Sequence, residues 1–131
     1  CQSTLGSELM SLSRGIAEGE WIRSLFGEAL NPNYQLKENK SFREKIKMKY
    51  LIDNKPIYDH QIGDGIVVKN KREAIDMLMV RMDFRENNMK LSWIETNNML
   101  ADVLTKENAP VALLLFVLRG GGYSLKSFDN F

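Results

Sequence analysis

Three acidic residues, Glu8, Asp53 and Asp102, lie close to points where the sequence predicts that a helix begins or a strand ends. Mg²⁺ binds oxygen ligands, keeps several waters and bridges substrate phosphates, so carboxylates are suitable protein ligands for it. Two such ions about 3.5–4 Å apart can activate a water and stabilise the leaving oxygen in phosphodiester cleavage. Composition and spacing alone do not select these three from the 17 acidic residues of the chain. The three carboxylates only make a two-metal site feasible.

Two of these acids also have a structural interpretation. Asp53 could cap a helix that starts near Pro56, a residue suited to the first helical turn, and the local pattern favours this interpretation. Its position at the end of a strand favours chemistry instead, because ligands of α/β sheets bind at the carboxyl ends of strands. Glu8 could simply be an acid near a helix N-terminus, where the helix dipole favours negative charge.

Other chemistries have less support. His60 is the single histidine of the chain and has no second histidine or cysteine near it for a zinc site. The glycines at 120–122 follow a predicted helix near the chain end, whereas a phosphate loop opens a helix after a strand. Cys1, the only cysteine, lacks the setting of a positioned nucleophile. A single cysteine also excludes an internal disulfide and is compatible with a reducing compartment.

The segments before and around Asp53 predict a long helix and a strand. Apolar residues at threes and fours follow Ser3-Thr4 and give an amphipathic helix of about twenty residues that carries Glu8 and ends near Gly27. Apolar and other side chains alternate from Ile46 to Ile52, the two-residue period of a strand. The strand stops at Asp53-Asn54, two residues that favour turns and helix caps.

After Asn54 the pattern predicts more helices and a second strand. In order these are a helix Lys55–Gln61, an extended or irregular segment Ile66–Lys69, a helix Lys71–Glu86, a turn at Asn87-Asn88, a strand Met89–Glu95, a helix Met99–Lys106 that carries Asp102 and, after Pro110, a helix Val111–Leu118. This order is an α/β layout, but two strands make a poor sheet for so many apolar helices. Because the chain begins with Cys1 rather than Met, we expect a longer precursor whose N-terminal side holds further strands. The segment should then expose one edge of its central strand and a large apolar helix face.

Charge and hydropathy restrict the function classes. The 131 residues carry a net charge of +1, which gives no overall electrostatic footprint for nucleic acid. Basic residues crowd between Lys37 and Lys49, where a solvated helix face or loop is favoured over a nucleic-acid contact. The longest apolar run, Ala109–Leu118, is far too short for a membrane span, and we expect no signal peptide.

Four blocks of the sequence resemble the ribonuclease H domain at the C-terminal end of copia-type retrotransposon polyproteins. They are Ser3–Leu12, similar to the start of the family's first helix with its glutamate, Trp21–Leu25, Asp53–Asp59 and Trp93–Lys106, which is similar to the family's W-V-x-T-x-x-x-L-A-D-x-L-T-K. Lys71-Arg72 and Asp76 are also placed like the family's K-R-x-x-x-D. The resemblance covers roughly residues 1–120, in order and with matching spacing.

The resemblance implies an RNase H-like fold, a mixed five-stranded sheet flanked by helices, here truncated before its first three strands. It implies a hydrolase that uses Mg²⁺, with Mn²⁺ as a substitute, to cleave the RNA strand of RNA–DNA hybrids. Carried over by position, the catalytic metal ligands are Glu8, Asp53 and Asp102. The residues expected to contact the nucleic acid are Thr4, Asn54, Lys71 and Arg72.

The same resemblance implies the partners and the organisation of the chain. The partners are an RNA–DNA hybrid and the upstream reverse transcriptase portion of the same polyprotein, with no membrane partner. The location is the cytoplasm, in a retroelement particle, or the nucleus. Residues 1–122 would form a partial RNase H-like domain and residues 123–131 a C-terminal tail.

The chain also departs from the family pattern. The family's first catalytic aspartate lies on a strand upstream of these 131 residues, so we expect little or no nuclease activity from them alone. Gly6 stands where many relatives carry a second acid. Two alternatives therefore stay open: a decayed or domesticated remnant with a binding or assembly role, and an unrelated α/β binding domain whose acids lie on its surface.

Overall fold

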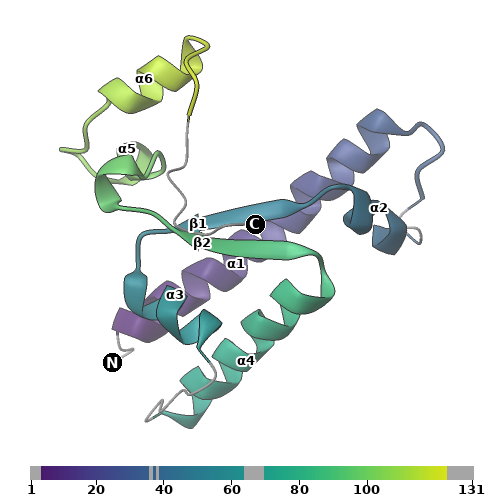
Figure 1. The fold of residues 1–131 in the computed structure, drawn as a ribbon, viewed down its shortest axis with the longest axis horizontal. Helices are drawn as coiled ribbons and strands as arrows, with labels where there is room; N and C mark the ends of the chain where they lie inside the picture. The colour runs from purple at the N-terminus through teal and green to yellow at the C-terminus, as the bar shows by residue number, and fades with distance from the viewer. Residues whose placement is uncertain (1–3, 36, 38, 64–69, 124–131) are drawn as a thin grey trace.

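A computed structural model of the chain describes residues 4–35, 37, 39–63 and 70–123, apart from the side chains of Thr4, Asn39 and Phe42 (Figure 1). The elements in chain order are α1 (Thr4–Leu30), α2 (Asn39–Lys45), β1 (Met48–Ile52), α3 (Lys55–Ile62), α4 (Lys71–Glu86), β2 (Met89–Trp93), the 3₁₀ turn η2 (Thr96–Asn98), α5 (Asp102–Thr105) and α6 (Ala112–Leu118). This mixture of helices and strands confirms the α/β class. Within the described residues no helix is both long and apolar enough to cross a membrane.

The two predicted strands pair with each other. β1 and β2 run parallel, with Tyr50 opposite Leu91 and Ile52 opposite Trp93. The ladder continues one residue past β2, where the amide of Ile94 donates to the carbonyl of Ile52 at 2.9 Å. Because the described residues contain only these two strands, each strand keeps an unpaired edge, as expected for the central strand.

The core lies between the sheet and helices α1, α3 and α4. Its buried residues are Leu9, Leu12 and Ile16 of α1, Ile57 of α3, Met77 and Val80 of α4, and Met89 and Leu91 of β2. The spacing of three and four on α1 places its three residues on one helix face, whereas the spacing of two on β2 places its residues on one sheet face. The buried faces of α1 and β2 therefore form one apolar layer that fixes α1 against the sheet.

Close approach of α1 to β1 depends on Gly19. A Cβ atom at this buried glycine would overlap the hydroxyl and ring of Tyr50. Tyr50 in turn donates its hydroxyl to the carbonyl of Ile16 at 3.2 Å and meets the ring of Phe84 edge-on, with centroids 5.6 Å apart. One aromatic side chain of the strand thus contacts both long helices.

A buried arginine ties the second half of α1 to three other segments. Arg23 is only 1% exposed, and its guanidinium donates to the carbonyls of Asn87 at 2.8 Å, Arg43 at 2.5 Å and Ile46. It also pairs with Glu20 at 3.0 Å, whose other oxygen lies 2.7 Å from Nε of Arg43. These polar contacts therefore hold α2 and the segments just before β1 and β2 against α1.

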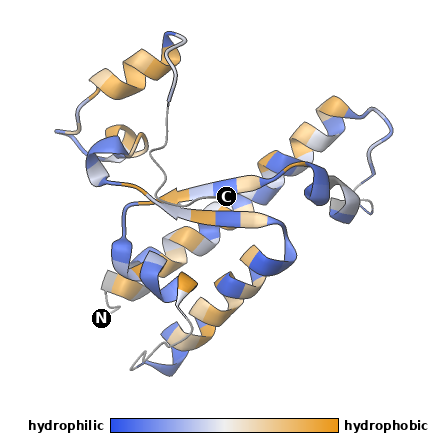
Figure 2. Cartoon of the chain, viewed as in Figure 1, coloured by the Kyte–Doolittle hydropathy of each residue, from blue (hydrophilic) through white to orange (hydrophobic). Residues whose placement is uncertain are grey.

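Many large apolar residues lie outside the core, in line with the expectation of an exposed apolar helix face. Those of α1 and α4 are Met10, Trp21, Ile22, Leu25, Phe26, Leu30, Ile75, Leu78, Met79 and Met82. Figure 2 shows that α6 is apolar along most of its length, and Leu115, Phe116 and Leu118 are exposed there.

Three sequence predictions need correction, whereas Lys71–Glu86 is confirmed to the residue as α4. Helix α1 continues past Gly27 to Leu30. The segment before the central strand contains a helix, α2, that the sequence did not predict. The helix expected over Met99–Lys106 is only α5, because η2 ends in an extended Met99 and no helix forms before Asp102. The prediction for 66–69 and most of the predicted tail lie outside the described residues.

Candidate active site

Asp53 lies directly after β1, as predicted, but it does not cap α3. The cap is Asn54, whose side-chain oxygen accepts a hydrogen bond from the amide of Ile57 at 3.1 Å. The main-chain carbonyl of Asp53 instead accepts from the indole Nε1 of Trp93 at 3.1 Å. Within the described residues no hydrogen bond engages the Asp53 carboxylate. The capping interpretation is therefore wrong, and the half-buried carboxylate stays available for another role.

The end of β2 fixes this corner of the sheet. The ammonium of Lys55 lies 5.2 Å from the centre of the Trp93 ring and pairs with Asp59 at 3.1 Å. The indole thus has its edge on the Asp53 main chain and its face on a cation. These contacts join the carboxyl ends of the two parallel strands, the edge where ligands of α/β sheets bind.

Glu8 lies on α1 next to the core residue Leu9. Its side chain is exposed, and no hydrogen bond or ion pair engages it within the described residues. Since Leu9 is buried against the sheet, the position of Glu8 along the helix is fixed by packing. The helix has no acid in its first turn, so Glu8 is its first negative charge.

Asp102 begins α5 and pairs with Lys106. Its Oδ2 lies 2.6 Å from the ammonium of Lys106, and 16% of the Asp102 side chain is exposed against 55% of the lysine. The amide of Lys106 also donates to the carbonyl of Asp102 at 2.8 Å. One turn of helix therefore carries both charges of the pair.

The hydrogen bond between Lys106 and Asp102 also affects the lysine. This hydrogen bond is the largest cause of a raised pKa of Lys106. Desolvation is the second-largest cause and opposes it, whereas the negative charges of Asp102, Asp53 and Glu8 add smaller effects that raise the pKa.

These carboxylates do not form a ready metal site. Among the described residues, no group of three acidic, histidine or cysteine side chains lies close enough together to hold an ion. Their oxygen chemistry suits Mg²⁺ or Mn²⁺, but the set is too open for the ion to be held by these residues alone. The ammonium of Lys106 satisfies Asp102 instead.

The residues predicted to contact nucleic acid lie at three places: the start of α1, the N-cap of α3 and the first turn of α4. Lys71 and Arg72 are exposed at the start of α4, which Asn70 caps by accepting from the amide of Arg72 at 2.9 Å. Thr4 is the first residue of α1, and its side chain lies outside the description. Asn54 serves as the cap of α3. Contacts of these residues with nucleic acid stay a prediction.

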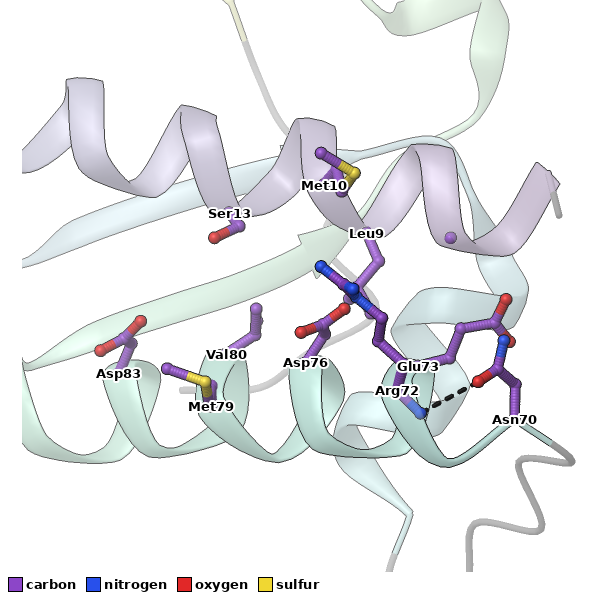
Figure 3. A pocket seen from close by; sticks show the side chains of 11 residues that line it. Leu9, Met10, Ser13, Asn70, Arg72, Glu73, Asp76, Met79, Val80 and Asp83 are labelled. Carbon is purple, nitrogen blue, oxygen red and sulfur yellow. Dashed lines mark hydrogen bonds between the residues drawn. The ribbon is translucent and has the colours of Figure 1, made fainter. Parts of the chain in front are cut away.

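A groove of about 450 Å³ runs between α1 and α4 beside Arg72 (Figure 3). Asp76 and Asp83 point from α4 toward α1, and Glu73 also lines the groove. Three carboxylates against one guanidinium make the groove unfavourable for a phosphate backbone.

Sequence reasoning missed Lys106 as the partner of Asp102. The signal was available, because a lysine four residues after an aspartate on a helix is positioned to form an ion pair with it. Arg23 was also missed as a buried residue, although a guanidinium inside the apolar run Trp21–Phe26 needs partners.

Comparison with models of protein families, with curated proteins and with solved structures finds no match for this chain.

Proposed function

We propose that the chain is the C-terminal portion of an RNase H-like ribonuclease H domain from a copia-type retroelement polyprotein. Its activity would be cleavage of the RNA strand of RNA–DNA hybrids by two-metal-ion hydrolysis. The observation that carries the proposal is the parallel pairing of β1 with β2, because it brings Asp53 and the segment before Asp102 to the same sheet edge.

In this proposal the protein residues supply oxygen ligands and position the hybrid. The metal ions, when bound, would activate water and stabilise the leaving oxygen. Discrimination of RNA from DNA would rest on contacts with the 2′-hydroxyl near the cleaved phosphate. Because the resemblance places a further catalytic carboxylate on an upstream strand, we expect residues 1–131 to be inactive by themselves.

The test compares residues 1–131 with the same chain extended by the upstream coding sequence. With a labelled RNA–DNA hybrid and Mg²⁺ or Mn²⁺, the extended protein should cleave the RNA strand and lose this activity with a chelator. Asp53→Asn or Asp102→Asn should lower the rate more than about 100-fold, since even outer-shell changes at metal sites cost about 10–100-fold. Glu28→Gln, an exposed change near the end of α1, is the matched control. Robust chelator-sensitive turnover by residues 1–131 would contradict the expected inactivity, and hydrolysis unaffected by Asp53→Asn would rule out the site.

A decayed or domesticated remnant, with a binding or assembly role, is the second candidate. It is favoured by the pairing of Asp102 with Lys106 at 2.6 Å, which engages one of the predicted metal ligands. The coding sequence upstream of residue 1 distinguishes the nuclease from the remnant. A preceding strand with an aspartate supports the nuclease, whereas a start codon at Met10 or an upstream stop codon supports the remnant.

A further inference from the structure

The groove between α1 and α4 carries two acidic positions with an apolar stretch between them. Along α4, Met79 and Val80 lie between Asp76 and Asp83, and all four residues line the groove (Figure 3). Leu9 lines it from α1. Because Leu9 and Val80 are buried core residues, the bottom of the groove is apolar and fixed by packing. The order along the groove is therefore acidic, apolar and acidic.

The carboxylates of Asp76 and Asp83 have no cationic partner in the part of the chain that the structure describes. Both side chains are half-buried, and both point from α4 toward α1 (Figure 3). Arg72 also lines the groove, four residues before Asp76 on the same helix, but among the described residues it forms no ion pair with that aspartate. Two carboxylates thus remain able to accept charge-assisted hydrogen bonds from a bound cation.

The spacing of the two carboxylates selects the shape of that cation. Seven residues of α-helix separate Asp76 from Asp83, a rise of about 10.5 Å. Metal ions hold their oxygen ligands at about 2.0–2.6 Å, so one ion cannot bridge the pair. The terminal nitrogens of extended spermidine lie about 11 Å apart at ordinary C–C and C–N bond lengths, whereas those of putrescine lie about 6 Å apart.

We propose that the groove between α1 and α4 binds a linear aliphatic polyamine of the length of spermidine. The terminal ammonium groups pair with Asp76 and Asp83, and the carbon chain lies over Met79 and Val80. Ser13, on the α1 wall, supplies a hydroxyl oxygen that accepts a hydrogen bond from the central nitrogen. The groove volume of about 450 Å³ suits a small ligand. This inference is independent of the proposed nuclease function, whose predicted metal ligands lie elsewhere.

The test measures spermidine binding to the full chain by isothermal titration calorimetry at low ionic strength. Asp76→Asn or Asp83→Asn should each weaken binding about tenfold, because each removes the charge that holds one end of the ligand. Glu86→Gln is the matched control, since it removes the same charge from an exposed position on α4 outside the groove, and it should have little effect.

Two further titrations of the unchanged chain test the spacing without any substitution. Putrescine should bind about tenfold more weakly than spermidine, because it reaches only one carboxylate at a time. At equal ionic strength Mg²⁺ should displace spermidine no better than Na⁺, since the two carboxylates cannot share one ion.

The inference is overturned if the chain does not bind spermidine, if Glu86→Gln weakens binding as much as the aspartate changes, or if putrescine binds equally well. Preferential displacement by Mg²⁺ would also overturn it in favour of a metal site. An oligolysine peptide that binds through Asp76 and Asp83 while spermidine does not would instead assign the groove to a basic segment of a partner protein.

Discussion

Residues 4–93 and residues 96–123 are held together in different ways. The first region contains every member of the apolar core cluster, drawn from α1, α3, α4 and β2. In the second region η2, α5 and α6 contain no buried residue. Its described ties are polar, such as the hydroxyl of Tyr123 donating to the carbonyl of Asn98 at 2.5 Å. Figure 1 shows α5 and α6 on the far side of the strands from α3 and α4.

The difference separates the three carboxylates of the candidate site. Glu8 and Asp53 belong to the packed region, so their main-chain positions depend on the core. Asp102 belongs to the region without buried residues and depends on its ion pair with Lys106. Local opening free energies are lowest where few apolar contacts are buried. The third carboxylate is therefore the one whose position can change while the rest of the fold stays intact.

The largest effect on the packed region should come from Arg23→Met. This change leaves the carbonyls of Ile46 and Asn87 without the guanidinium donor. It also removes one of two donors to the carbonyl of Arg43 and one of the two arginine partners of the poorly exposed Glu20. Breaking a buried ion pair by removing one partner costs about 3–5 kcal/mol, so the free energy of unfolding in urea should fall by this amount.

Arg14→Met is the matched control for Arg23→Met, since Arg14 is an exposed arginine of the same helix. It should change the free energy of unfolding by less than about 0.5 kcal/mol. Equal effects of the two substitutions on the free energy of unfolding would show that the buried contacts of Arg23 add no stability.

A pair of truncations compares the two regions directly. Met77 is fully buried in α4, and Met77→Ala should cost about 2–5 kcal/mol through lost burial and a residual cavity. Leu118 of α6 is 72% exposed, and Leu118→Ala should cost less than about 0.5 kcal/mol. Urea unfolding followed by circular dichroism measures both. A Leu118→Ala cost close to that of Met77→Ala would mean that α6 belongs to the same cooperative unit as the core.

The smallest expected effect is a pH dependence that separates Tyr50 from Tyr123. The pKa of Tyr50 is raised, first by burial and then by the charge of Glu20, against an opposing effect of Arg23. The folded state thus favours the neutral phenol, and the stability this gives is present below about pH 10 and is lost as the pH rises through the raised pKa.

Tyr50→Phe cannot ionise and should lose less stability across this alkaline window, although at neutral pH it loses about 1 kcal/mol with the hydrogen bond to Ile16. Burial also raises the pKa of Tyr123, but that residue lies in the region without buried helices. Tyr123→Phe should therefore leave the alkaline slope of global unfolding unchanged. Unfolding in urea between pH 8 and 11 measures both slopes. If the free energy of unfolding depends on pH equally in both variants, the two tyrosines do not differ in their contribution to global stability.

The accuracy of the sequence predictions also differs between residues 4–93 and residues 96–123. In the packed region the apolar period of Lys71–Glu86 and the alternation from Ile46 to Ile52 gave elements with nearly correct ends, because burial of one face determined them. Helix α2 was missed because its sequence, NKSFREK, holds one apolar residue and no period. The guanidinium of Arg23 donates to the carbonyl of Arg43 in this helix, a tertiary contact that no local pattern encodes.

The site was predictable in part for the same reason. Asp53 was located correctly because a strand end and a turn are local signals. The helix around Asp102 was predicted too long, since Met99, Leu100, Val103 and Leu104 have a helical period although no core buries them. The ion pair of Asp102 with Lys106 could have been predicted from their four-residue spacing on a helix.

The contact between Gly19 and Tyr50 has a consequence for sequence variation. Any side chain at position 19 would occupy the space of the Tyr50 hydroxyl. In sequences that keep this fold, the two positions should change together, with a larger residue at 19 accompanied by a smaller one at 50. An alanine or serine at position 19 that retains the tyrosine would mark a lineage in which the first helix has moved away from the strand.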